Sequence, residues 1–384
     1  MLAIDVGSTR IKAAYLATGA REPGFVCFDG KPWLASQAHV PADGNRVVFG
    51  DAAQRRAEVD AAGTIDGDVL AQVALFGSVR IGRRTVPAHE LLGSLLTFVR
   101  AQAAACKAPP EALEDLVVAM PWGGDGAAEA NLRAAAQSAG FDDARVMFAP
   151  EAAAAATGGL PPGSSLPANL IWVDVGGRTA RLAWLRGEDG RLALQTEVRP
   201  RLLAEAGAAS ADLAVLEQLL DEAEDDSPLH PGEHATALRQ LAAARELLGN
   251  SDEPLALRLP SRTLTFESAL VRRAIARCVT EPLRASVEQF LKDIALCGVG
   301  EPEILLTGGA NGAPGLREAM SEFGCSVVAA RSGDEAVVRG ALLASMPVAP
   351  SSPVEPPPPV TGGNRSRAQD IGLRRLAGGT GTTR

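Results

Sequence analysis

The chain has 384 residues, of which 46% are hydrophobic and 4% aromatic, and it carries a formal net charge of -9. One hydrophobic core rarely serves a chain of this length, so we expect an α/β protein with two lobes, whose cores consist mainly of Ala, Leu and Val. The acidic balance excludes nucleic acid and anionic membrane surfaces as expected partners, because both attract clustered Lys and Arg.

The cysteines and the N-terminus bear on the compartment. The five cysteines form no C-x-x-C pair and have no metal-ligand spacing to the four histidines. Asp5 lies inside the first apolar stretch without a basic segment before it, and no later run reaches the roughly 18 apolar residues of a membrane helix. The sequence therefore predicts a cytoplasmic protein with reduced thiols.

The first half begins as strand, turn, strand. Leu2 to Val6 and Ile11 to Leu16 are short apolar pieces separated by a Gly-Ser-Thr turn, which predicts a hairpin. The apolar side chains of residues 87–106 then recur at helical spacing, and a buried strand ending at Pro121 follows. A helix, a short strand and a second helix complete this half, up to the glycines at 158 and 159.

The second half repeats this plan. Ile171 to Leu185 reads as strand, turn, strand, and helices are expected around 211–223 and 233–248. A long helical pattern runs from about Phe266 to Ala295. The strand "EILLT", the glycine-rich turn "GGANGAPG" and a closing helix follow it.

These patterns divide the chain into an N-terminal lobe (1–165), a C-terminal lobe (166–346) and a proline-rich tail (347–384). Proline supports neither helices nor sheet ladders, so the tail is expected to be an extended, disordered segment. Its end is basic and carries Arg374 and Arg375. The sequence leaves open whether this end docks a partner or has no function.

An Asp-Val-Gly sequence ends a strand in each half, at Asp5 and at Asp174. Such a strand end presents backbone N–H groups and hydroxyls to a phosphate, and its carboxylate can hold magnesium through water. A single copy would be better explained as an ordinary hairpin. Because the two copies occupy equivalent points and a third glycine turn follows "EILLT", the sequence favours one nucleotide held in a cleft.

In this order, the segments resemble the actin-like ATPases, and most closely the nucleotide-binding domain of the heat shock protein 70 (DnaK-type chaperone) family, from Leu2 to about Ala344. The matching pieces are "AIDVGST", "FGDAAQ", "IGRR", "VVAMP", "LRAAAQSAGF", "APEAAAAATGG", "VDVGGRT", "LLTGGANGAP" and "GDEAVVRGALL". The resemblance implies an actin-like, ribonuclease H-like α/β fold with two duplicated lobes around a nucleotide cleft.

The resemblance also implies a site for ATP or ADP with Mg²⁺. Catalytic roles fall on Asp5, Glu151, Asp174 and Thr179. Of these, Asp5 and Asp174 would hold the metal through water, and Glu151 would position the attacking water. From its position alone, Glu151 is equally a carboxylate in the first turn of a helix. The implied nucleotide contacts are Gly7, Ser8, Thr9, Arg10, Gly176, Gly177, Arg245, Gly308, Gly309 and Ala310.

Three departures from the family pattern bear on catalysis and on the base. Aligning on "IGRR" places Ser78 where the family has a lysine, with Arg80 as the nearest cation. Arg181 replaces an acidic residue near the magnesium, and Gly312 replaces an arginine on the adenosine side. The chain is therefore expected to be either a weak ATPase or an ATP-binding pseudo-enzyme.

The resulting functional prediction is an ATP/ADP-gated conformational switch of chaperone type, acting on a protein partner or co-chaperone without the family's peptide-binding β-domain. Two alternatives stay open. A sugar- or acetate-type kinase shares the two Asp-Gly hairpins, although no Asp here stands in a recognisable kinase context. An actin-like filament protein would require large exposed apolar faces.

Overall fold

The structure is a computed structural model, and it describes residues 1–20, 22–41, 46–57, 59–120, 126–156, 166–188, 191–223, 228–247, 254–330 and 333–346. Met1–Met346 form one compact unit. The expected strand end at Pro121, the expected helix end at residues 158 and 159, and the proline-rich tail lie outside the described residues. No helix in the described part is long and apolar enough to cross a bilayer.

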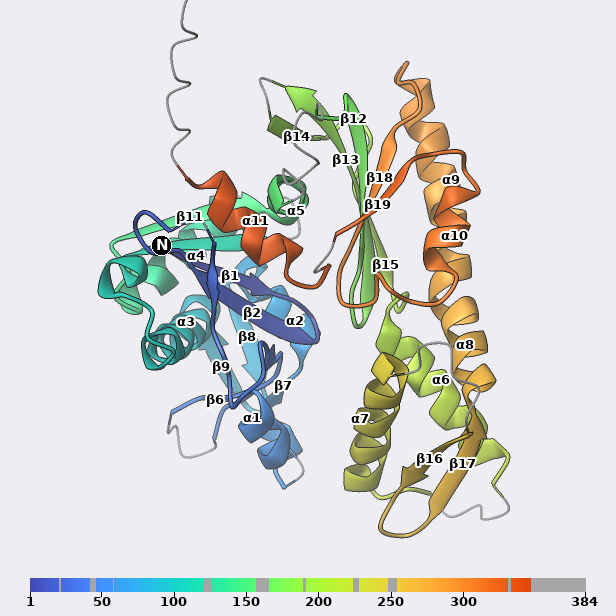
Figure 1. The fold of residues 1–384 in the computed structure, drawn as a ribbon. Helices are drawn as coiled ribbons and strands as arrows, with labels where there is room; N and C mark the ends of the chain where they lie inside the picture. Colours follow the sequence, from blue (N-terminus) through green and yellow to red (C-terminus); the bar gives the residue numbers. More distant parts are fainter. Residues whose placement is uncertain are drawn as a thin grey trace, which may run out of the picture. The chain divides into compact units, whose positions relative to one another are not determined.

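A mixed sheet occupies the N-terminal half (Figure 1), with the strand order β11-β10-β1-β2-β3 and with β4 beside β2. Its strands are β1 (Leu2–Val6), β2 (Arg10–Tyr15), β3 (Gly24–Phe25), β4 (Leu34–Ala35), β10 (Asp115–Met120) and β11 (Asp143–Phe148). β1 pairs antiparallel with β2 and parallel with β10. The predicted hairpin after the first Asp-Val-Gly is therefore confirmed.

A second sheet repeats this arrangement, in the order β14-β13-β12-β18-β19 and with β15 beside β13. Its strands are β12 (Asn169–Val175), β13 (Thr179–Glu188), β14 (Arg191–Gln195), β15 (Arg201–Ala204), β18 (Glu303–Thr307) and β19 (Val327–Ala329). β12 pairs antiparallel with β13 and parallel with β18, as β1 does with β2 and β10. The matching topology agrees with the expected duplicated α/β fold.

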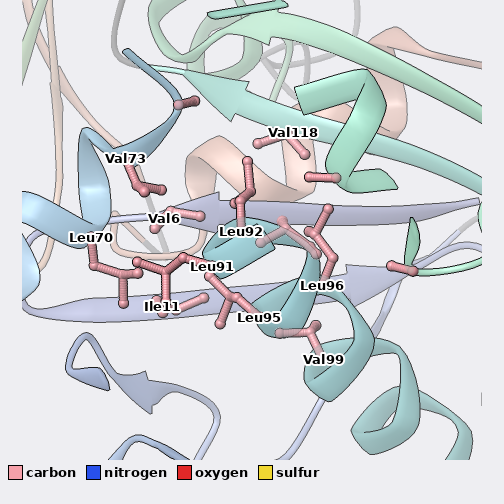
Figure 2. Packing of buried hydrophobic residues seen from close by; sticks show 14 of the residues in the cluster. Val6, Ile11, Leu70, Val73, Leu91, Leu92, Leu95, Leu96, Val99 and Val118 are labelled. Carbon is pink, nitrogen blue, oxygen red and sulfur yellow. The ribbon is translucent and has the colours of Figure 1, made fainter. Parts of the chain in front are cut away.

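Helices α3 (Ala88–Ala105) and α4 (Gly126–Ser138) contribute to the core of the first sheet. The apolar residues of α3 that recur at helical spacing are all buried, as that spacing predicts. They are Leu91, Leu92, Leu95, Leu96 and Val99. Figure 2 shows them beside Val6 and Ile11 of the first hairpin, so packing in this core holds the hairpin in place.

Helices contribute much of the core that packs on the second sheet. Its helices are α6 (Ala208–Asp221), α7 (Pro231–Leu247), α8 (Ser268–Ile275), α9 (Glu281–Leu296) and α10 (Leu316–Ser321). A π-helical turn, Ala276–Thr280, joins α8 to α9. The long helix expected from Phe266 begins two residues later, at Ser268. Phe266 instead belongs to a hairpin that was not predicted, formed by β16 (Pro254–Arg258) and β17 (Thr263–Glu267).

Two alanine-rich helices, α5 (Ala149–Ala156) and α11 (Ala336–Ala344), pack against each other and against strands of both sheets. Their shared apolar cluster includes Ala3 of the first sheet and Trp172 of the second. A Cβ atom at Gly340 would overlap the carbonyl oxygen of Ala152, so only glycine permits this approach of the two backbones. Small side chains thus let one helix pair serve both sheets.

The remaining described elements of the first half are short. They are β5 (Ala38–His39), β6 (Val48–Phe49), α1 (Asp51–Ala57), β7 (Thr64–Ile65), α2 (Gly67–Ala71), β8 (Ser78–Ile81) and β9 (Arg84–Pro87). β8 and β9 form an antiparallel hairpin that leads directly into α3.

Candidate functional site

A cavity of about 300 Å³ lies at the ends of β1 and β12, where the three glycine turns meet. It is lined by residues from both sheets and from α6 and α7. All the predicted site residues line it except Glu151. They are Asp5, Gly7, Ser8, Thr9, Arg10, Asp174, Gly176, Gly177, Thr179, Arg245, Gly308, Gly309 and Ala310. The structure thus brings together segments that are 300 residues apart in sequence, whereas the role of each residue stays a prediction.

The first hairpin closes with a hydrogen bond from the Gly7 N–H to the Arg10 carbonyl, at 3.1 Å. A Cβ atom at Gly7 would lie 2.7 Å from that carbonyl oxygen, so the tightness of the turn requires glycine. Ser8 is buried beside it, and the Thr9 carbonyl accepts a hydrogen bond from the Ser36 N–H at 3.0 Å. The turn is therefore held in one conformation at the cavity wall.

The second hairpin closes in the same way, with the Gly176 N–H donating to the Thr179 carbonyl at 2.9 Å. The Gly177 carbonyl accepts a hydrogen bond from the Ala209 N–H at the start of α6, at 2.6 Å. A Cβ atom at Gly177 would overlap the side chain of Thr9, so the two hairpins touch at this glycine. Two phosphate-turn candidates therefore face one cavity from opposite sheets.

The third turn is tied to the second hairpin. Gly308 has a φ of +90°, and a Cβ atom there would lie 2.7 Å from Asp174 Oδ1. The Gly308 N–H donates to the Gly333 carbonyl at 2.8 Å, and the Ala310 N–H donates to the Val175 carbonyl at 2.9 Å. Only a residue without a side chain fits the backbone at Gly308, which explains the first glycine after "EILLT".

Each hairpin places a cation directly across from its aspartate. Asp5 pairs with Lys12 in the β1–β2 register, and Asp174 pairs with Arg181 in the β12–β13 register. Arg181 Nη1 lies 3.7 Å from Asp174 Oδ2, and Thr307 donates a hydrogen bond to Asp174 Oδ1 at 3.2 Å. Directly opposed strand residues lie on one face, so both cations point to the cavity that they line.

Burial dominates the titration of the first aspartate. It raises the pKa of Asp5 from its ordinary 3.8 to about 6, while the positive charges of Lys12 and Arg181 act against this rise. The negative charges of Asp174 and Asp334 add to it. The ionisation of Asp5 therefore depends on the balance between its burial and the charges of its neighbours.

Arg245 of α7 forms a two-pronged ion pair with Asp212 of α6, with nitrogen–oxygen distances of 3.0 and 3.2 Å. Asp212 is 4% exposed, and burial raises its pKa although Arg245 opposes the shift. The pair fixes the Arg245 guanidinium at the cavity wall, where the resemblance places an adenosine contact.

Trp33 lines the cavity on the side of the first sheet. The Arg10 guanidinium lies 4.5 Å from the ring centre, and Lys31 Nζ lies 4.8 Å from it. Arg10 also pairs with Glu246 of α7, and Lys31 pairs with Asp51 at 2.7 Å. The cavity therefore contains an aromatic face flanked by cations, which the sequence analysis did not identify.

Within the described residues, each acidic side chain that lines the cavity faces a Lys or Arg. The remaining pair is Lys12 with Asp334, whose Nζ–Oδ2 distance is 3.6 Å, and Lys12 also donates to the Asp334 carbonyl. The acidic lining residues are Asp5, Asp51, Asp174, Asp212, Glu246 and Asp334. The basic ones are Arg10, Lys12, Lys31, Arg181, Arg239 and Arg245, so the lining charges are balanced.

Glu151 differs from its expected role. It lies in the first turn of α5, and its Oε1 accepts a hydrogen bond from the Leu194 N–H of β14 at 3.0 Å. Ala149, two residues earlier, is the α5 residue that lines the cavity. The Glu151 carboxylate therefore binds the backbone of β14. The contribution of α5 to the cavity lining is Ala149, whose side chain is a methyl group.

Ser78 and Arg80 also lie elsewhere than expected. The "IGRR" segment forms the turn of the β8–β9 hairpin and the adjoining strand residues, and neither Ser78 nor Arg80 lines the cavity. Both side chains are exposed. The substitution of Ser78 for the family's lysine therefore carries no conclusion about the cavity, and Arg80 is no substitute for that lysine.

The residues that the sequence analysis missed include Lys12, Trp33, Asp212 and Asp334. A signal for Lys12 was present, because a cation stands seven residues after the Asp in both "DVGSTRIK" and "DVGGRTAR". Across a short turn, that spacing places the two residues opposite each other. Asp212 and Asp334 reach the cavity from distant helices and loops, so no local pattern marks them.

Comparisons with known proteins agree with this geometry. The sequence model of the family described as Hsp70 protein matches residues 55–355. The chain is 28% identical over 251 residues to heat shock 70 kDa protein 4L of Homo sapiens, covering 60% of this chain and 29% of that protein. It is 25% identical over 381 residues to chaperone protein DnaK of Deinococcus radiodurans, covering 88% and 58% respectively. The chain thus spans less than two thirds of the length of either relative.

Proposed function

This chain belongs to the Hsp70 family, and from that premise we propose that its cavity binds ATP or ADP and that the nucleotide controls how the two sheets close on it. The observation that carries the proposal is the convergence of three glycine turns, from β1, β12 and β18, on one cavity. Backbone N–H groups at such turns are suited to phosphate oxygens, and Arg245 offers a fixed planar cation to the nucleoside.

Three ion pairs that join the N-terminal half to the C-terminal half are the candidate closing contacts. Lys12 of the first hairpin reaches Asp334, Arg10 reaches Glu246, and Arg178 of the second hairpin donates to Asp68 Oδ2 at 2.8 Å. A nucleotide that competes for Lys12 or Arg10 would change the balance between closed and open arrangements. Such a change is the physical basis of a chaperone-type switch.

We propose that hydrolysis is slow. A general base must be free to accept a proton, and every acidic side chain lining the described cavity faces a cation. Glu151 is bonded to β14, and Ala149 lines the cavity in its neighbourhood. A chain that binds the nucleotide but hydrolyses it slowly would change conformation according to which nucleotide is bound.

Magnesium held through water by Asp5 and Asp174 is what the resemblance implies, but these residues do not fit that group. Asp5 already faces Lys12, and Asp174 already faces Arg181, in each case on the same side of their own sheet. A divalent ion placed between them would lie beside two further positive charges.

A cytoplasmic location and a protein partner, either a co-chaperone or a client, complete the proposal. The relative from Deinococcus radiodurans is named as a chaperone, which supports this class of partner. The family match does not favour the kinase or the filament alternative.

Two glycines of one turn provide the test. Gly309 lines the cavity, and a Cβ atom there meets nothing closer than Asp334 Cβ at 3.8 Å. Gly309→Val should therefore fold and narrow the site, weakening ATP or ADP binding by about tenfold or more in a calorimetric titration. Gly312→Val is the matched control, because a side chain there meets no atom within 4 Å and Gly312 does not line the cavity. Absence of binding to the unsubstituted protein would contradict the proposal.

A further inference from the structure

We propose that this cavity takes its nucleotide as a metal-free polyphosphate, with Lys12 and Arg181 supplying the positive charge that faces the phosphates. The inference rests on the proposed function and specifies the ligand form of that same site. It reverses the expectation that ATP or ADP enters together with Mg²⁺.

The first argument is duplication. The two sheets have the same strand order, and each places a cation opposite the Asp of its Asp-Val-Gly turn. One such pair would be an ordinary ion pair of a core. Two cations at equivalent positions of the two sheets, both in the wall of one cavity, form a duplicated cationic site.

The second argument is accessibility combined with burial. The side chains of Lys12 and Arg181 are 9% and 13% exposed, yet both residues line the cavity. Their remaining solvent contact is therefore with the cavity itself. Removed from bulk water, a cation in such a wall attracts an anion more strongly than a surface cation does.

The third argument is the geometry of the glycine turns. The turn after β1 lies between Asp5 and Lys12 in sequence, and the turn after β12 lies between Asp174 and Arg181. Each cation therefore stands at the base of a turn whose residues also line the cavity. A phosphate that binds a turn meets the ammonium or guanidinium of the same hairpin.

The neighbouring cations argue against a divalent ion at this place. Lys12 and Arg181 already bring two positive charges to Asp5, Asp174 and Asp334. Mg²⁺ would have to displace both side chains or share the carboxylates with them. Displacement would leave two buried cations without their carboxylates, which is costly.

The first experiment uses the unsubstituted full chain. Calorimetric titrations with ATP and with ADP are run in EDTA and in excess Mg²⁺. We expect dissociation constants that agree within about threefold between the two conditions. Binding in Mg²⁺ that weakens tenfold or more in EDTA overturns the inference while leaving nucleotide binding intact. Absence of binding in both conditions overturns the proposed function and this inference with it.

The second experiment removes the cations singly. Lys12→Gln and Arg181→Gln should each weaken ATP binding in EDTA by about tenfold or more, since each loses a charge-assisted contact to phosphate. Mg²⁺ should restore part of the affinity of Arg181→Gln, because Asp174 has then lost its cation. A purely structural ion pair would not create this dependence on metal.

Arg80→Gln is the matched control, because Arg80 is an exposed arginine of β8 that does not line the cavity. It should leave the EDTA titration unchanged. Thermal unfolding of each variant identifies those that have lost their fold. If folded Lys12→Gln and Arg181→Gln both keep the affinity of the unsubstituted protein in EDTA, the two cations do not hold the phosphates and the inference is wrong.

Discussion

The two Asp-Val-Gly hairpins share a turn and a cation directly across from the aspartate, but they differ in how far their charges reach. Lys12 of the first hairpin extends to Asp334, a residue of the loop before α11, whereas Arg181 of the second stays with Asp174 of its own hairpin. Asp174 also receives a hydrogen bond from Thr307, while burial raises the pKa of Asp5. The same local sequence thus provides a self-contained pair in one sheet and a bridging pair in the other.

The largest expected effect concerns the turn that supports the second hairpin. Gly308→Ala should lower the free energy of unfolding by about 4 kcal/mol, because φ at Gly308 is +90° and the new Cβ atom would overlap the Val175 carbonyl oxygen and meet Asp174 Oδ1 at 2.7 Å. Chemical denaturation measures the change. Gly312→Ala in the same turn should change stability by less than about 1 kcal/mol, since nothing lies within 4 Å of its Cβ position. Equal effects of the two substitutions would mean that the tie to Asp174 is not needed.

The next effect distinguishes the two aspartates by pH. The pKa of Asp5 rises from 3.8 in an unfolded chain to about 6 in the fold, so the folded state holds the proton more tightly. The free energy of unfolding of the unsubstituted protein, taken relative to that of Asp5→Asn, should therefore be highest below about pH 4. It should fall by about 3 kcal/mol between pH 4 and pH 7.

Denaturation of both proteins at a series of pH values measures that difference, and Asp174→Asn gives the comparison with the second hairpin. A flat difference between the unsubstituted protein and Asp5→Asn across this range would show that Asp5 is not buried as an acid.

A smaller effect compares equivalent glycines. A Cβ atom at Gly7 would lie 2.7 Å from the Arg10 carbonyl oxygen, whereas one at Gly176 would lie 3.1 Å from the Thr179 carbonyl oxygen. Gly7→Ala should therefore cost about 1 to 2 kcal/mol more than Gly176→Ala, because the backbone must shift further in the first turn. Paired unfolding curves test this order, and a larger cost at Gly176 would reverse the comparison.

The smallest effect concerns a bridge at the surface. Arg178 donates to Asp68, but the two side chains are 43% and 38% exposed. Arg178→Ala should change the free energy of unfolding by no more than about 1 kcal/mol, and the change should shrink in high salt. A loss of several kcal/mol that persists in salt would make Arg178 a main closing contact, on a par with Lys12.

Much of the site could be predicted from the sequence because it depends on short-range rules. Asp-Val-Gly ends a strand at a tight turn, and that turn recurs at Gly7 and Gly176 with the same closing hydrogen bond. The buried face of α3 follows from helical spacing alone. These features need no knowledge of distant residues, and the structure has them where they were expected.

Two of the segments carry side chains that do not line the cavity, for a reason of local geometry. Two positions along an α-helix turn a side chain by about 200°, so Glu151 points away from the cavity that Ala149 lines. The "IGRR" segment lies in a hairpin, and alternation along a strand gives no indication of which cavity the strand approaches. Resemblance over a few residues identifies the segment but leaves the direction of each side chain open.

The sequence by itself determined the duplicated strand-turn-strand units, the three glycine turns and the cation seven residues after each aspartate, because backbone sterics and strand alternation act over a few residues. Only the tertiary structure decided that Lys12 reaches Asp334, that Arg245 is held by Asp212, and that each acidic residue of the described cavity faces a cation. Those pairings join residues far apart in the chain, and their energies depend on burial, which arises when the two sheets and their helices pack together.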